Sequence, residues 1–292
     1  MDYPKHYQIN YYNGNIPISE VPIGSTVIDP SWTWEHRTGN DYTEELIYHN
    51  GRAQYYSEKK PVTWIVVAKN HYREGFEKAD SSFFKVNSDE ALIPHVTLIS
   101  EALIGKFCFD LRSGKSVIPF LNTDYGETRW GLSGDSNAKK GLRSWLNSTC
   151  VHEGEGFYQA FSENFKQAVL TTTVPCIDYN HEKYTTQDKV FVPSARELGI
   201  LENIGRDFEK EYKYFKGDYE TYFNGGVFSK RSVKLAYNYW WYWTRTFFDE
   251  IEVTRVTQAG DFKTDQPTSD WGGVRPVLNI KAETLVCETK IK

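Results

Sequence analysis

The chain has 292 residues and 39% hydrophobic content, enough for one large domain or two smaller ones with a buried core, which excludes a disordered protein. A formal net charge of -5 offers no basic surface for phosphate, so we expect no nucleic-acid partner. The 20 Tyr, 17 Phe and 9 Trp residues could form a dense core or a binding surface.

Targeting signals and metal motifs are not predicted. No basic stretch with an apolar h-region opens the chain, and no window approaches 18 uninterrupted apolar residues, so we expect a cytoplasmic protein that does not contact a membrane. The four cysteines lack a C-x-x-C pair and a histidine at zinc spacing, which predicts reduced thiols and neither metal nor cofactor. They are Cys108, Cys150, Cys176 and Cys287.

Residues 1–121 are expected to form a β-rich N-terminal part that contributes strands to the core. The β-branched runs at 63–68 and 96–99 predict buried strands. A third strand is expected at 105–110, where polar and aromatic residues alternate. Residues 122–140 are rich in Gly, Ser, Asp and Asn and predict a loop at the boundary between two parts of the chain.

The C-terminal part, residues 142–284, is expected to begin with two helices. The first, at 139–147, is short. The second is predicted at 157–169, because Phe157, Phe161 and Phe165 recur at intervals of four on one helical face. Such a stripe is far more often core than a ligand groove.

A strand followed by a short helix is expected at 188–198. Ser194 is the predicted N-cap of that helix, and Glu197 stands three residues later, where it would complete a capping box. These two side chains are therefore expected to be structural.

Two aromatic segments follow, and they supply the candidate binding residues. The charged, tyrosine-rich segment near 205–234 is interpreted as an insertion or lid, and 237–248 as a strand with Trp241 and Trp243 on one side. Further strands are predicted at 252–256 and 274–280. The interface candidates are Tyr212, Tyr214, Phe215, Tyr219, Tyr222, Trp240, Trp241, Trp243 and Arg245.

The candidate catalytic motifs in the sequence are incomplete. Ser113-Gly-Lys-Ser resembles the end of a phosphate-binding loop, but Phe109 stands where the first glycine is required, and His152 and His181 each lack a second metal-binding histidine. Trp271-Gly-Gly-Val-Arg275-Pro is more specific. Its structural interpretation is a turn with Arg275 held against carbonyls or a carboxylate, and the alternative is an anion-binding arginine at a pocket.

Five motifs in order resemble a known family: residues 142–147, the Phe-rich helix, residues 188–198, Trp240-Trp-Tyr-Trp-Thr-Arg, and Gly273-Val-Arg-Pro-Val. The similarity is to an uncharacterised bacterial and phage domain family with a C-type-lectin-like core, related in plan to the formylglycine-generating-enzyme fold. It implies an α+β fold with a mixed, twisted β-sheet core, two flanking helices and long loops. The structural markers that it implies are Trp145, Asn147, Glu197, Trp271 and Arg275.

Two departures from related proteins limit what the resemblance implies. The Glu-Pro-Asn loop and Trp-Asn-Asp strand of calcium-dependent sugar binding do not occur in the sequence. The paired cysteines of the copper-dependent oxidases are also missing, because Cys287 stands by itself near the end of the chain. Neither activity is expected here.

We therefore expect a non-catalytic protein-binding module that acts through aromatic anchors at residues 205–248. Because family members are carried by phages, one version is a phage-encoded inhibitor that docks on a host defence protein in the host cytosol. A tail or receptor-binding role is another. The alternatives are a small-ligand-binding protein or enzyme with a pocket near Arg245 and Arg275, and a structural subunit of a phage or surface assembly, including a homo-oligomer.

Overall fold

Strands dominate the structure. The computed structural model describes residues 4–37, 47–49, 52–54, 57–72, 93–110, 130, 141–147, 156–177, 183–200, 210–216, 230–235, 238–267, 269 and 272–289. These residues form strands β1 to β18 and two short α-helices, so the protein is mostly β with a mixed sheet at its core. The expected α+β class with two flanking helices is therefore wrong.

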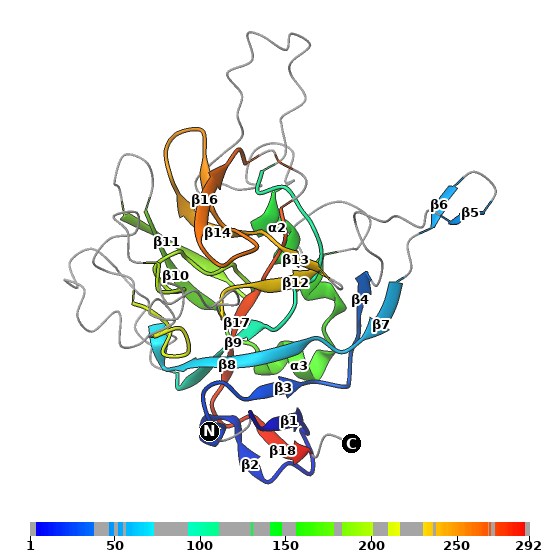
Figure 1. Cartoon of the computed structure of the whole chain (residues 1–292). Coiled ribbons are helices and arrows are strands. Elements are labelled where there is room, and N and C mark those ends of the chain that lie inside the picture. The colour runs from blue at the N-terminus through cyan, green and yellow to red at the C-terminus, as the bar shows by residue number, and fades with distance from the viewer. Residues whose placement is uncertain are drawn as a thin grey trace.

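The core sheet joins the two ends of the chain. Its order is β17-β9-β8-β3-β1-β18-β2, and it is mixed because β1 and β3 are parallel while the other neighbours are antiparallel (Figure 1). N-terminal strands thus share one sheet with strands from the last 16 residues of the chain. The bounds are β1 His6–Ile9, β2 Ile16–Pro17, β3 Thr26–Ile28, β8 Thr63–Lys69, β9 His95–Ser100, β17 Val277–Lys281 and β18 Leu285–Thr289.

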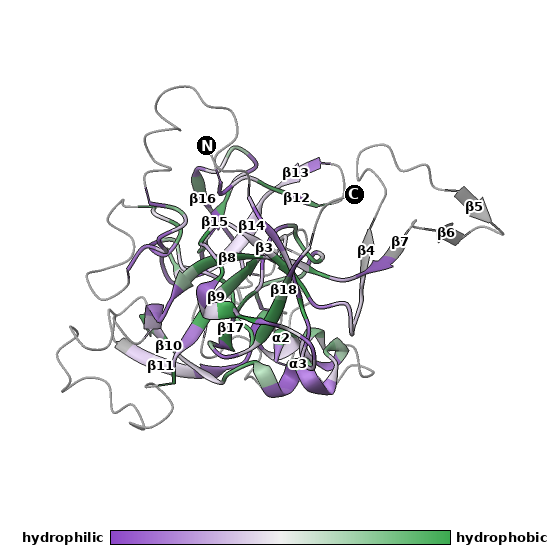
Figure 2. Cartoon of the chain, turned by 90° about the horizontal axis from the view of Figure 1, so that it is seen from below, coloured by the Kyte–Doolittle hydropathy of each residue, from purple (hydrophilic) through white to green (hydrophobic). Residues whose placement is uncertain are grey.

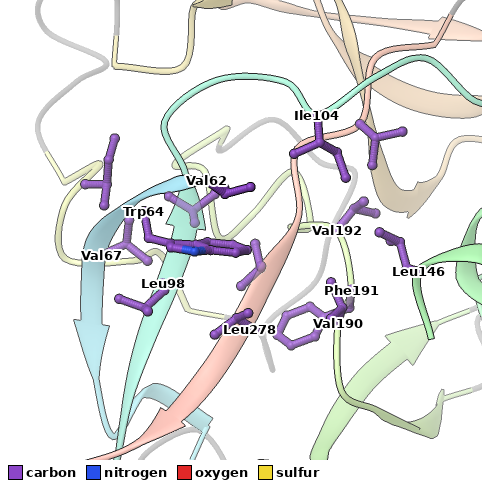
Figure 3. Packing of buried hydrophobic residues seen from close by; sticks show 14 of the residues in the cluster. Val62, Trp64, Val67, Leu98, Ile104, Leu146, Val190, Phe191, Val192 and Leu278 are labelled. Carbon is purple, nitrogen blue, oxygen red and sulfur yellow. The ribbon is translucent and has the colours of Figure 1, made fainter. Parts of the chain in front are cut away.

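The strands predicted at 63–68 and 96–99 are confirmed as β8 and β9. Every residue of β9 and the five inner residues of β8 are buried, as expected of central strands covered on both faces. Figure 3 shows side chains of β8 and β9 packed with those of β17 and of residues 190–192, with Phe191 beside Leu278. Hydrophobic residues accordingly concentrate on β8, β9 and β17 at the centre of Figure 2.

The described residues also form five smaller sheets. The three-stranded one, β14-β15-β16, stands at one end of the molecule and β1 and β2 at the other (Figure 1). The remaining bounds are β4 Trp34–Arg37, β5 Ile47–His49, β6 Arg52–Gln54, β7 Ser57–Lys60, β10 Thr172–Ile177, β11 Lys183–Asp188, β12 Val233–Leu235, β13 Asn238–Trp240, β14 Tyr242–Phe247, β15 Val253–Val256 and β16 Phe262–Asp265.

Helices are short where the sequence predicted longer ones. The 3-10 helix η1 spans Ile18–Glu20, α2 spans Leu142–Leu146, the 3-10 helix η4 spans Phe157–Ala160, and α3 spans Glu163–Ala168. The continuous helix expected at 157–169 is wrong, because Phe161 is extended and Ser162 then caps α3 by accepting from the Phe165 amide. Phe157 of η4, Phe165 of α3 and Phe161 between them are nevertheless all buried in the core.

Three further predictions on local structure need correction. Residues 105–110 form isolated bridges, Lys106 to Gly273 and Asp110 to Gly141, in place of a strand. The aromatic run at 237–248 is interrupted at Trp241 between β13 and β14. After β11 ends, 195–199 forms turns and Phe191 bridges to β17, so the predicted strand and helix at 188–198 are wrong.

An aromatic cluster joins η4 and α3 to the sheet. The Trp32 ring lies 4.6 Å from Phe161 and 5.5 Å from Phe165, and Trp64 of β8 lies 6.4 Å from both Phe157 and Phe165. Rings at these separations add to the stability gained from their burial. The predicted core role of the phenylalanine stripe is confirmed.

Candidate functional site

Four of the eight aromatic residues predicted to contact a partner lie in the core. A side chain without accessible surface cannot touch another protein, so the interface role of the buried ones is wrong; they pack the interior instead. Tyr214 and Trp241 are partly buried and keep some surface. The buried candidates are Tyr212, Phe215, Trp240, Trp243 and Arg245, whereas Tyr219, Tyr222 and the marker Trp271 lie outside the described residues.

Glu197 and Arg245 form a buried ion pair. Arg245 on β14 donates from Nη1 to Glu197 Oε2 at 2.6 Å and from Nη2 to Oε1 at 2.7 Å. Tyr72 donates to Oε1 and Tyr212 to Oε2, each at 2.9 Å, and the Ser194 amide also donates to Oε2 at 2.9 Å. One carboxylate oxygen therefore accepts two hydrogen bonds and the other accepts three.

The predicted capping box forms around this pair. The Glu197 amide donates to Ser194 Oγ at 3.1 Å while Glu197 Oε2 accepts from the Ser194 amide, although the segment is a turn and not a helix. The Glu197 carboxylate thus closes a local turn and also binds Arg245 of β14, which is 48 residues later in the sequence.

Electrostatics keep the Glu197 carboxylate ionised. Burial by itself raises the pKa of Glu197, but the charge and hydrogen bonds of Arg245, with His71 nearby at 3.8 Å, outweigh burial and hold that pKa well below its usual range. Burial, followed by the Glu197 charge, raises the pKa of Tyr72 and Tyr212, which stay protonated and donate. A buried, fully hydrogen-bonded carboxylate of this kind stabilises the fold and is not placed to exchange protons with a substrate.

Arg275 is held by carbonyls, one of the two structural arrangements predicted for it. Its Nε donates to Ser100 O at 3.1 Å, and its Nη1 donates to the Tyr242 hydroxyl at 3.2 Å and to Lys230 O at 3.5 Å. The guanidinium also lies 5.7 Å from the Phe215 ring. Arg275 is only 1% exposed, so its guanidinium is not accessible to an anion from solvent, which argues against the anion-binding alternative.

The paired glycines of the Trp271 motif follow from close packing. A Cβ at Gly272 would overlap the Trp243 indole, whose Nε1 donates to Phe107 O at 2.8 Å. A Cβ at Gly273 would lie 2.5 Å from Trp241 O. The backbone of Trp241 and the indole of Trp243 lie so close to this segment that only glycine fits at the two positions, which makes the motif a packing feature.

Asn147 and Trp145 anchor α2. Asn147 Nδ2 donates to Val190 O at 2.8 Å, and its Oδ1 accepts from the amides of Lys189 and Val190 at 2.8 and 3.1 Å. The Trp145 ring stacks on Phe107 at 5.0 Å. Both side chains fasten the helix to neighbouring segments.

Chemistry at metal or thiol sites is not indicated by the described residues. They contain no group of three or more His, Cys, Asp or Glu side chains that could hold a metal ion. Cys108 and Cys176 are buried and Cys287 is partly exposed, and Cys150 lies outside these residues, as do Ser113, His152 and His181. No helix in this part of the chain has the length and apolar character needed to cross a membrane.

An apolar turn is exposed at the end of the β14–β15 hairpin. Phe248 is 45% exposed and Ile251 is 39% exposed, and we call residues 248–251 the hairpin turn. Asp249 Oδ1 accepts from the amides of Ile251 and Glu252 at 2.8 Å each, which fixes the backbone between them. Sequence reasoning included Phe248 within the aromatic run but missed Ile251, since no local pattern shows which residue of a turn stays exposed.

Cation–ring contacts lie around β13. Three consecutive rings each carry a cation from another part of the chain: Lys234 Nζ is 5.3 Å from the Tyr239 ring, Lys106 Nζ is 3.9 Å from Trp240, and the Arg255 guanidinium carbon is 4.5 Å from Trp241. We call these six residues the β13 cluster. Sequence reasoning missed its cations, since only Lys234 lies within the aromatic segments at 205–248.

Comparison with known families gives one match. A family model described as a domain of unknown function, DUF6273, matches residues 122–282, which is more than half of the chain. The chain belongs to the DUF6273 family. The matched part of this DUF6273 chain includes Asn147, the Glu197–Arg245 pair and Arg275, together with the hairpin turn. No curated protein and no solved structure matches the chain, so the C-type-lectin-like plan stays a prediction.

Proposed function

We propose that this DUF6273 protein is a non-catalytic binding module that docks on another protein through its hairpin turn. The exposure of Phe248 and Ile251 carries the proposal, because large apolar side chains left on the surface are typical anchors of protein interfaces. The host-protein partner expected from the sequence fits this proposal and stays a prediction.

The hairpin turn is organised before a partner arrives. β14 and β15 pair from Tyr242 with Val256 to Phe247 with Val253, and the Phe248 amide donates to Glu252 O at 2.9 Å beyond the last pair. The side chains of β14 from 242 to 246 are buried, so the base of the hairpin is fixed in the core. A rigid anchor loses little conformational entropy on binding, which favours affinity.

The polar core supports the non-catalytic part of the proposal. Glu197, Arg245 and Arg275, which are the strongest candidates for acid-base or anion chemistry, are engaged by protein groups and buried. An enzyme needs such groups to face a substrate, whereas a scaffold needs them to hold β14 and the Gly273 segment in place.

The test compares capture by two variants. In a pull-down from the native host, Phe248→Ala with Ile251→Ala should lose a partner that the unchanged protein retains, because hot-spot truncations typically cost about 2 kcal/mol or more each. Tyr12→Ala is the matched control, since Tyr12 is 81% exposed and lies near β1 and β2 at the opposite end of the molecule (Figure 1).

Two further measurements decide between outcomes. Urea unfolding should be the same for all three proteins, since the substituted side chains are exposed. Retention of the partner by the double variant would overturn the role of the hairpin turn. The mass of each protein in solution tests the structural-subunit alternative. That alternative would be favoured if the unchanged protein has a mass that is a multiple of 33.9 kDa and the double variant has the mass of one chain.

A further inference from the structure

β16 is an edge strand of the three-stranded sheet. The order β14-β15-β16 places it last, and no other strand of the described residues pairs with its outer side. An edge strand presents backbone N–H and C=O groups on which another strand can pair. We infer that β16 pairs with β16 of a second copy of this chain. The inference goes beyond the proposed function, because it uses a different surface and a different partner.

The backbone groups of Phe262 and Thr264 face the open side of β16. The Thr257 amide donates to Asp261 O at 2.8 Å, which shows that Asp261 faces β15. Backbone groups of successive residues in an antiparallel pair face alternate sides, so Phe262 and Thr264 face away from β15. The Thr264 carbonyl has one long contact, from Arg255 Nε at 3.4 Å, and a carbonyl oxygen can accept a second hydrogen bond.

The side chains of β16 are complementary to those of a second β16. Lys263 and Asp265 stand two residues apart and therefore lie on the same face of the strand. In an antiparallel pair centred on Thr264, each Lys263 lies opposite the partner's Asp265, and Thr264 lies opposite its own counterpart. The two-fold symmetry of such a pair brings two pairs of opposite charges together.

Both charged side chains can take part in this contact. Lys263 is exposed, and no ion pair joins it to another of the described residues. The Asp265 side chain is 32% exposed; its Oδ2 lies 3.2 Å from Arg255 Nε, and its Oδ1 accepts from the Gln266 amide at 2.9 Å. A carboxylate offers about four acceptor sites, so Asp265 keeps the capacity to bind a lysine.

The charge arrangement favours a second copy over an unrelated strand. A lysine alone on an edge strand opposes pairing with other proteins. An incoming strand must therefore place an acid opposite Lys263 and a base opposite Asp265 in the correct register. A second β16 does so by symmetry, whereas another protein needs a sequence matched to this one.

The direct test is the mass of the full chain by sedimentation equilibrium. Because the paired edge is short, the measurement covers about 10–100 μM protein, where weak association through a small interface is visible. The unchanged protein should reach twice 33.9 kDa as its concentration rises. Lys263→Glu places like charges opposite each other in both symmetric pairs and should weaken association about tenfold or more.

A charge exchange between two variants tests the register. Asp265→Lys also places like charges opposite each other, so each single variant should stay as one chain at concentrations where the unchanged protein pairs. An equal mixture of Lys263→Glu and Asp265→Lys should recover the mass of two chains, because the new glutamate of one variant then lies opposite the new lysine of the other. A mixture that stays as single chains would overturn the inference.

Two more variants separate the charges from the backbone. Lys216→Glu makes the same charge change at an exposed lysine outside the sheet and should pair as the unchanged protein does. Thr264→Pro removes an outward N–H, leaves both charges in place and should also weaken association. Urea unfolding of each variant verifies that the fold is kept. An unchanged protein that stays as one chain, or a folded Lys263→Glu variant that still pairs, would overturn the inference.

The outcomes for β16 and for the hairpin turn can be read separately. Phe248→Ala with Ile251→Ala should keep the mass of two chains, because its side chains lie outside β16. Lys263→Glu should lose the second copy and still capture the host partner. Failure of the pull-down prediction therefore leaves the β16 pairing standing, and failure of the mass prediction leaves the proposed docking through the hairpin turn standing.

Discussion

Replacing Glu197 with glutamine tests the buried ion pair most sharply. Glutamine keeps the shape of the side chain but removes its charge, which leaves the Arg245 guanidinium buried without a counter-ion. Breaking a buried pair in this way costs about 3–5 kcal/mol. Since domains are stable by about 5–15 kcal/mol, Glu197→Gln should lose a large fraction of the free energy of unfolding.

The same carboxylate predicts a pH dependence. Its pKa is depressed in the folded protein, so its contribution to stability is full above about pH 5 and is lost as the pH falls below the unfolded-state value of about 4.3. Glu197→Gln should remove this contribution. The difference in unfolding free energy between the two proteins should therefore shrink as the pH falls from 6 toward 3.

The assay is urea unfolding followed by tryptophan fluorescence at several pH values. If Glu197→Gln does not fold, Tyr212→Phe gives a milder test, because it removes one hydroxyl that donates to the carboxylate at 2.9 Å and should cost about 1.5–3 kcal/mol. Adding Arg245→Met to Glu197→Gln removes both charges and should restore part of the stability. A Glu197→Gln protein as stable as the unchanged one, with the same pH dependence, would refute the account of this pair.

Other contacts give smaller or more local effects. Phe165→Ala removes a fully buried ring from the cluster around Trp32 and should cost about 3–5 kcal/mol in urea unfolding; a cost under 1 kcal/mol would contradict the packing described. Ser162→Ala removes the N-cap of α3 and should cost about 1 kcal/mol, with Ser162→Gly closer to the unchanged protein. Asn147→Ala leaves backbone groups of Lys189 and Val190 without their partner and should cost about 2–3 kcal/mol, more than the loss of the cap.

The sequence predicted those parts of the fold whose signals are local and strong. The β-branched runs at β8 and β9 lie in the middle of the sheet, where both faces are buried, so an unbroken apolar run is sufficient evidence for them. The capping box at Ser194 was likewise visible, because both partners stand three residues apart.

The spacing of apolar residues gave a wrong secondary structure where the pattern of buried side chains did not match the pattern of backbone hydrogen bonds. The spacing of Phe157, Phe161 and Phe165 predicted one helix, yet Ser162 starts a second piece and all three rings still reach the same core. An apolar repeat records which residues are buried and not which backbone groups pair. The alternation at 105–110 failed for the same reason, since those residues pair singly with Gly273 and Gly141.

The candidate site was the least predictable part of the molecule. An aromatic run looks the same whether its rings fill the core or face a partner, and tertiary packing buried Trp240 and Trp243 while leaving Trp241 half-covered. The cations that cover this run come from β12, β15 and the segment after β9, so no window of sequence contains them all.

By itself the sequence determined that this is a folded chain with an aromatic core, two buried central strands and a local capping box. These features follow from the composition, from uninterrupted apolar runs and from hydrogen bonds between residues close together in the sequence. Tertiary structure decided that Glu197 would meet Arg245, that Arg275 would rest on carbonyls, and that Phe248 and Ile251 would stay exposed. Each of these outcomes depends on contacts between residues far apart in the chain, and such contacts exist only once the sheet has assembled.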